Sequence, residues 1–350
     1  MVGLVITLIG FFWSDDILVK MNTPPEIMED ARVYLTILLA GVYSTVIYNL
    51  LSSTIMALGD SKTPLIFLII ACFLNGAMDY IFIVTFKMGI AGAAWATVIA
   101  QFLSGLLCLI YIMHRAKILI LRWEDWRGLT CLDLWRSIRL GLPMGFQTCI
   151  IALGCIVVQI ALNKLGPVAV AAFTTANKVD FFAMAPMMSF GMAMATYVGQ
   201  NYGAGKFDRI KDGVHRCCRM SLTFTVFISL INIYYGSYFV SLFVGKEEVE
   251  VIQLSHVYMA LNASMYWVLA FLFIYRYTLQ GLGQSVVPTF AGVMELVMRL
   301  AAVEFLVVPL GFGGVCLASP LAWIGSAVPL AIAYYWTLHR LFARIKRALP

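Results

Sequence analysis

PLIFLIIACFLNGAMDYIFIVTF, residues 64–86, is the stretch that decides the fold of this chain. It is almost wholly apolar, contains one charged side chain, and shows no alternation of period two. A transmembrane helix requires about 20 mostly apolar residues, whereas a strand of a membrane barrel alternates polar and apolar side chains. Lipid admits only helices and closed barrels, because backbone polar groups must be satisfied internally. The stretch therefore predicts a membrane-spanning helix.

Similar apolar runs lie on both sides of residues 64–86. The whole chain is 62% hydrophobic and 12% charged, whereas a soluble domain is about half apolar and about a quarter charged. We therefore predict an all-α polytopic membrane protein with about ten transmembrane helices. The predicted spans cover residues 1–14, 32–57, 64–86, 89–113, 135–162, 168–199, 214–244, 251–280, 286–308 and 313–339.

Basic residues are distributed unevenly between the two sets of alternate loops. Many lie at 114–139, 206–219 and 340–347, whereas the loops near Lys87 and Lys164 hold only one each. Cytoplasmic loops carry the lysine and arginine excess, so both termini are predicted to be cytoplasmic. The apolar run at Met1 lacks a basic leader, which argues against a cleavable signal peptide. We expect a multi-pass protein of the bacterial cytoplasmic (inner) membrane.

Two parts of the chain resemble each other at an offset of about 224 residues. LG-x-S-x-x-P occurs at 58–64 and again at 282–288, and G-x-x-G occurs at 89–92 and at 311–314. Matched segments have the same orientation, which predicts two pseudo-symmetric helical lobes related as parallel repeats. The second copy holds six spans and the first only four, so we expect that two helices of the first copy are absent from this chain.

The predicted domain organisation follows from this repeat. It comprises an incomplete N-terminal lobe of four helices, a cytoplasmic linker between the lobes, a C-terminal lobe of six helices, and a basic cytoplasmic tail. These are assigned to residues 1–115, 116–133, 134–340 and 341–350.

Several motifs resemble those of the multidrug and toxic compound extrusion (MATE) family. They are GQNYGAG at 199–205, TPPE at 23–26 followed by A-x-x-Y at 31–34, GDSKTP at 59–64, and GIAGAAWAT at 89–97. The resemblance implies twelve helices in two six-helix lobes, of which this chain would hold helices three to twelve. It also implies export of cationic or amphipathic organic compounds in exchange for protons or sodium ions.

Asp79 is the strongest candidate for a functional residue, because an ionisable group at bilayer depth is costly. Asn75 lies one turn away on the same helix face, and Thr97 lies at a similar depth on the next span. These oxygen-bearing groups suit a small hard cation, and the carboxylate alone could carry a proton. A hydrogen-bonded packing contact is the structural alternative. Resemblance to the DinF-like branch of the family implies a cation or proton site at these three positions.

Polar and soft side chains in later spans are candidates for a substrate cavity. Glu295 and Arg299 are four residues apart, which favours a neutralised structural pair, with substrate contact as the alternative. Methionines are adaptable enough for a promiscuous apolar pocket, although ordinary packing also explains them. The predicted cavity set is Gln147, Lys178, Asp180, Met184, Met188, Arg276, Glu295 and Arg299.

The sequence favours transport over catalysis. All four histidines lie at span ends or in loops, and no metalloprotease, hydrolase or phosphate-loop motif occurs. We therefore predict a monomeric exporter of small organic substrates that contacts membrane lipid. No cofactor is expected beyond a transported H+ or Na+, and no nucleic acid would bind. A lipid-linked saccharide flippase and an inactive truncated fragment are the alternatives.

Overall fold

The computed structural model describes Thr7 and residues 18–19, 27–120, 128, 130–245 and 247–348. Within these residues the secondary structure is helical, without strands, which confirms the predicted all-α fold. The predicted span at 1–14 lies outside the described residues except for Thr7. The chain forms two compact units, residues 1–128 and 129–350, called here the N-terminal and C-terminal units.

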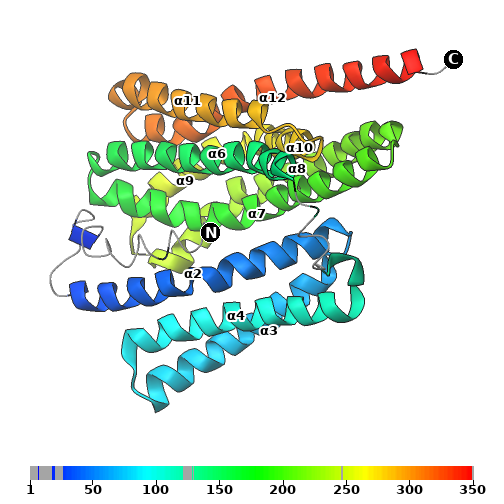
Figure 1. Ribbon diagram of the computed structural model, residues 1–350. Helices are drawn as coiled ribbons and strands as arrows, with labels where there is room; N and C mark the ends of the chain where they lie inside the picture. Colours follow the sequence, from blue (N-terminus) through cyan, green and yellow to red (C-terminus); the bar gives the residue numbers. More distant parts are fainter. Residues whose placement is uncertain are drawn as a thin grey trace. The chain divides into compact units, whose positions relative to one another are not determined.

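The described part of the N-terminal unit contains three long helices. They are α2 (Met28–Ala57), α3 (Lys62–Tyr80) and α4 (Gly89–Arg115). A π-helical segment, η2 (Ile81–Thr85), continues α3, and a short 3-10 helix, η3 (Lys117–Leu119), follows α4. Helix α4 packs against both α2 and α3, whereas α2 and α3 have little contact with each other (Figure 1).

Glycine residues let α2 and α4 approach each other closely. A Cβ atom added at Gly41 would lie 2.2 Å from Val98, and one at Gly105 would lie 3.5 Å from Ile47. Small residues are the usual means by which membrane helices come near each other, because lipid provides no hydrophobic force between them.

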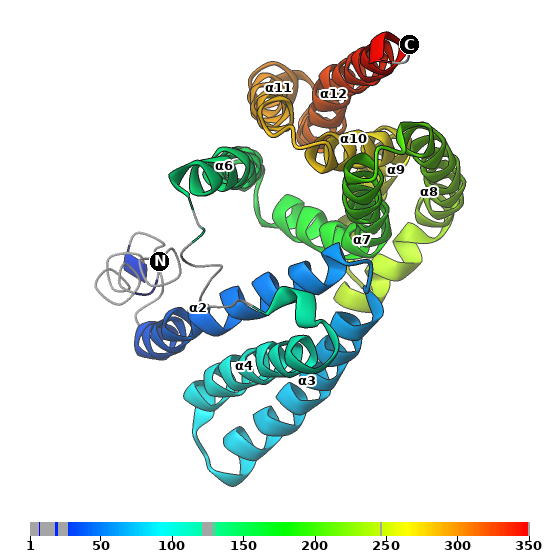
Figure 2. The same cartoon turned by 45° about the vertical axis from the view of Figure 1, so that its right-hand side comes forward.

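The C-terminal unit holds the remaining helices. They are α6 (Cys131–Asn163), α7 (Pro167–Gly203), α8 (Phe207–Val244), α9 (Val249–Ala263), α10 (Tyr266–Gly281), α11 (Val286–Leu310) and α12 (Phe312–Ala348). Helices α11 and α12 lie side by side, and α7, α8 and α10 surround the main core (Figure 2). The local sequence explains where two of these helices begin. Thr130 and Asp133 form a reciprocal capping box before α6, and Pro167 occupies the first turn of α7.

The structure breaks the predicted span at 251–280 into two helices, α9 and α10. The two halves are bent by 49° at Ser264 and Met265. The Ser264 hydroxyl donates to the Leu261 carbonyl at 2.8 Å, a local bond that competes with the helical ladder. Serine-induced disruption is a known cause of kinks, and here it occurs without proline or glycine.

The lengths and composition of the helices fit a membrane protein. Among the residues that the structure describes, seven helices are long and apolar enough to cross a bilayer, and the number is eight if the bent pair α9–α10 forms one span. Helices α8 and α12 extend beyond their predicted spans. Helix α8 starts at Phe207 rather than at residue 214, and α12 continues through much of the predicted basic tail to Ala348.

Candidate functional site

Asn75 and Asp79 lie one turn apart on α3, as predicted, and both are half-buried. The Asn75 amide nitrogen and the Asp79 Oδ1 atom are shielded from solvent. Neither has a hydrogen-bond partner among the residues that the structure describes. An unsatisfied buried polar atom carries a free-energy cost of about 1–3 kcal/mol, so two such atoms one turn apart require an explanation.

The helix changes its geometry directly after Asp79. Helix α3 ends at Tyr80, and the π-helical segment η2 follows, closed by a bond from the Phe86 amide to the Ile81 carbonyl at 3.0 Å. Single π turns are rare and occur frequently at functional sites. The widened turn thus supports a functional role for this part of α3.

Thr97 lies on α4, the helix that packs against α3, and is half-buried. Its hydroxyl donates to the Ala93 carbonyl of its own helix at 3.0 Å. In the described part of the chain, no hydrogen bond joins Thr97 to Asn75 or Asp79. The direct convergence of the three groups therefore stays a prediction.

Gln101 is a residue that the sequence analysis missed. It lies one turn beyond Thr97 on α4, and its Oε1 atom is shielded from solvent without a partner in the described residues. Since α3 and α4 are joined by the short turn at Lys87, Gln101 is at about the depth of Asn75. The spacing of four residues between Thr97 and Gln101 could have indicated from the sequence that Gln101 lies on the same helix face. The N-terminal candidate site therefore comprises Asn75, Asp79, Thr97 and Gln101.

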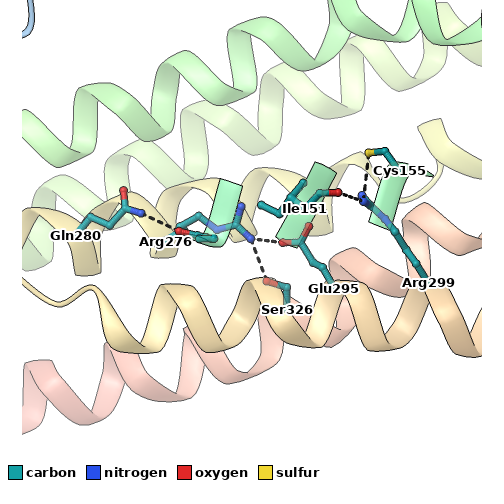
Figure 3. A network of polar contacts seen from close by, with 8 residues as sticks. Ile151, Cys155, Arg276, Gln280, Glu295, Arg299 and Ser326 are labelled. Atoms are coloured by element: carbon teal, nitrogen blue, oxygen red, sulfur yellow. Dashed lines mark hydrogen bonds and ion pairs between the residues drawn. The ribbon is translucent and has the colours of Figure 1, made fainter. Parts of the chain in front are cut away.

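Several predicted cavity residues of the C-terminal unit come together between α6, α10, α11 and α12 (Figure 3). Arg276 of α10 forms an ion pair with Glu295 of α11 and donates to the Ser326 hydroxyl at 3.1 Å. Gln280, one turn after Arg276, donates to Gln147 Oε1 at 3.3 Å. These contacts join four helices through buried and half-buried polar groups.

The expected pairing of Glu295 with Arg299 is wrong. Glu295 pairs with Arg276, and Arg299 instead donates to the Ile151 carbonyl of α6 at 3.1 Å (Figure 3). Gly154 makes room for this guanidinium, since a Cβ atom there would lie 2.9 Å from Arg299 Nη1. The i,i+4 spacing allowed a local pair, but a partner on another helix was available for each charge.

Asp180 occupies a second buried polar cluster, centred on the break between α9 and α10. Its side chain is 1% exposed. Tyr258 of α9 donates to its Oδ2 at 3.0 Å, and Tyr266 of α10 donates to its Oδ1. The Tyr266 oxygen in turn accepts a bond from Asn232 at 2.8 Å. Both carboxylate oxygens are thus satisfied, one from each side of the bend.

The other predicted cavity residues do not join these clusters. Lys178 is exposed, and its Nζ lies 6.0 Å from the centre of the Phe243 ring. Met184 packs partly against the main core, and Met188 is exposed. In the described residues no three His, Cys, Asp or Glu side chains gather as metal ligands.

Comparison with known proteins adds independent information. A family model described as MatE matches residues 1–81 and 143–303, which together form well over half of the chain. The probable multidrug resistance protein YpnP of Bacillus subtilis is 30% identical over 241 residues, which cover 68% of this chain and 53% of that protein. The probable multidrug resistance protein NorM of Thermotoga maritima is 25% identical over 348 residues, covering 93% of this chain and 70% of that protein.

Solved structures show the same fold. The crystal structure of the Vibrio cholerae MATE transporter VcmN in the bent form superposes with a TM-score of 0.87 at 21% sequence identity. The match covers 97% of this chain and 76% of that one.

Proposed function

Because this chain belongs to the MatE family, we propose that it exports small cationic or amphipathic organic compounds in exchange for H+ or Na+. The relatives named as multidrug resistance proteins support the class of substrate. The prediction that the chain is not an enzyme agrees with its family. The apolar helices identify a multi-pass membrane protein.

The main support for the proposed cation coupling is the pair of unsatisfied polar groups on α3. Asp79 Oδ1 and the Asn75 amide are shielded from solvent and unpartnered in the described residues. Rotating the amide by 180° would present an oxygen in place of the nitrogen. A carboxylate that must bind and release a cation in each cycle cannot be tied permanently to other donors. Asp79 therefore suits reversible binding of a proton or a sodium ion.

Exposed side chains on one face of α7 supply apolar surface for the substrate. Phe181, Met188 and Met192 are spaced by seven and four residues, and each is more than a third exposed. Flexible methionines adapt to ligands of different shape, which suits a transporter of several compounds.

Replacement of Asp79 by Asn tests the coupling role directly. The protein is reconstituted into liposomes, and efflux of a fluorescent cationic dye is driven by a pH gradient or a sodium gradient. We expect Asp79→Asn to reduce gradient-driven efflux by about tenfold or more, the size of an ordinary coupling free energy between two sites. Whichever gradient drives the wild-type protein identifies the ion.

The control variant is Glu250→Gln, which neutralises an exposed carboxylate in the first turn of α9. It should leave efflux within about twofold of the wild type, as surface charge changes usually do. Undiminished gradient-driven efflux by Asp79→Asn would refute the assignment. The 350-residue chain is assayed beside a form extended by its upstream coding sequence. Activity of the extended form alone would support the truncated-fragment alternative.

A lipid-linked saccharide flippase is not favoured. Such a protein would be expected to carry free basic groups in its cavity, but Arg276 is neutralised by Glu295 and Lys178 is exposed. We also propose that the protein is a monomer in the bacterial inner membrane, with cytoplasmic termini and general contact with lipid. The asymmetry of basic residues between alternate loops supports the orientation.

A further inference from the structure

A cavity of ≈ 580 Å³ lies between α8, α10 and α12 of the C-terminal unit. Aromatic rings line it from two helices. Phe271 and Tyr275 of α10 stack with ring centres 6.1 Å apart, and Tyr275 stacks on Tyr334 of α12 at 5.1 Å. Tyr335 completes this aromatic wall. The volume is within the ordinary range for small-molecule sites.

Helix α8 supplies the charged lining of the same cavity. Arg216, Arg219, His215 and Asp212 line it, so the formal charge is +1 with the histidine neutral. Neither arginine forms an ion pair with a carboxylate in the described part of the chain. The His215 Nδ1 atom is bonded to the Lys211 carbonyl at 2.8 Å, which leaves Nε2 available. The cavity therefore offers two unpaired guanidinium groups.

A buried hydroxyl also lacks a partner at this cavity. Tyr334 is 1% exposed, lines the cavity, and its phenolic oxygen has no hydrogen bond among the described residues. That oxygen is shielded from solvent, so the donors of this cavity that a ligand can reach are the two exposed guanidinium groups. The complementary ligand therefore carries an acceptor with negative charge.

The sequences of two helices place the cavity at the membrane–water boundary. On α8, charged residues end at Arg219, and residues 220–244 contain none. On α12, residues 312–338 are uncharged, and Tyr335 and Trp336 are more than half exposed just before Arg340. Exposed tyrosine and tryptophan residues are typical of the interfacial belt, where lipid headgroups lie.

We propose that this cavity binds the phosphate group of an anionic membrane lipid. Arg216 and Arg219 would bind the phosphate oxygens. The acyl chains would lie along the exposed apolar flank of α8, which includes Met220 and Phe227. Arginine forms strong charge-assisted bonds to phosphate, and basic pockets between membrane helices are known sites for anionic headgroups.

Native mass spectrometry of the full-length chain in detergent tests the proposal. The protein is titrated with phosphatidylglycerol or with phosphatidylcholine of the same acyl chains, and lipid adducts are quantified. We expect Arg216→Gln combined with Arg219→Gln to weaken phosphatidylglycerol binding by about tenfold, as loss of charge-assisted bonds to phosphate implies. Phosphatidylcholine binding should change little.

The matched control is Arg209→Gln combined with Lys211→Gln, which removes the same charge from the same helix outside the cavity. It should retain nearly wild-type binding of phosphatidylglycerol. Equal losses in both double variants would overturn the proposal, because the effect would then be one of net charge. Complete displacement of the lipid by inorganic phosphate at equal concentration would also overturn it, since the ligand would then be a soluble anion.

Discussion

Asp79 and Asp180 are both carboxylates within apolar helices, but their surroundings differ. Asp180 is enclosed in the C-terminal unit, and hydroxyl groups from α9 and α10 satisfy its two oxygens. Asp79 in the N-terminal unit is half-buried, and its shielded oxygen has no partner in the described residues. The difference separates a carboxylate that stabilises a bend from one that is available to a ligand.

The buried arginine Arg276 resembles Asp180 in this comparison, because it already has its partners. Glu295 of α11 neutralises Arg276 of α10. The pair therefore holds these two helices in position against each other. A group that already has its partners must break bonds before it can bind a ligand. The comparison therefore predicts large effects on stability in the Arg276 and Asp180 clusters, and effects mainly on transport at Asp79.

The largest effect on stability is expected when the Arg276–Glu295 pair is broken. Glu295→Ala leaves a buried guanidinium without its counter-charge, which should cost about 3–5 kcal/mol of unfolding free energy. Thermal unfolding of the purified protein, followed by intrinsic fluorescence, measures the change. The double variant Arg276→Met with Glu295→Met should recover most of the loss. Equal instability of the single and double variants would contradict the ion-pair explanation.

A smaller loss is expected at Asp180. Asp180→Leu removes the acceptor of the Tyr266 hydroxyl, which is then left unsatisfied at a cost of about 1–3 kcal/mol, whereas the Tyr258 hydroxyl keeps Asn177 Oδ1 as its acceptor at 2.8 Å. Asp79→Leu, measured in the same way, should leave the melting temperature unchanged or raise it, because an unsatisfied oxygen is removed. If Asp79→Leu destabilised the protein as much as Asp180→Leu, the contrast between the two carboxylates would fail.

The smallest effect concerns Asp60, a carboxylate in the turn between α2 and α3. Hydrogen bonds from Thr63, and then from Tyr111, hold the pKa of Asp60 below its ordinary value of 3.8. Its contribution to stability is therefore complete above pH 4 and is lost as the pH falls through the lowered pKa. Melting temperatures are recorded from pH 7 to pH 3. The melting temperature of the wild type should fall further over this range than that of Asp60→Asn, and the fall for Tyr111→Phe should be intermediate.

The helical architecture could be predicted from sequence because its cause is local. Apolar runs interrupted by glycine, proline and charged residues define the helices from α2 to α12, within a few residues at most ends. The break at Ser264 was not predictable, because serine is common in continuous membrane helices and no proline or glycine marks it. Its cause includes the clamp of Tyr258 and Tyr266 on Asp180, which only the folded chain brings together.

The polar sites were predictable in part. Asn75 and Asp79 stand out because a carboxylate and an amide one turn apart are unusual in an apolar run. The partner of Glu295 was not predictable, since Arg299 and Arg276 are both within reach in principle and only helix packing selects between them. The cavity beside α8 also escaped the sequence analysis, because Arg216 and Arg219 resembled ordinary cytoplasmic-loop charges and the aromatic wall comes from two distant helices.

The glycine contacts between α2 and α4 have a consequence for movement within the N-terminal unit. Val98 against Gly41, and Ile47 against Gly105, interlock the two backbones, so neither helix can slide along the other without a collision. Helix α3 makes no such close contact at Gly76, where an added Cβ atom would have no neighbour within 4 Å in the described structure. The glycine contact of this helix lies beyond Asp79, where a Cβ atom at Gly92 of α4 would lie 2.9 Å from Phe82 of η2, so a shift of α3 relative to the pair of α2 and α4 would pivot at η2.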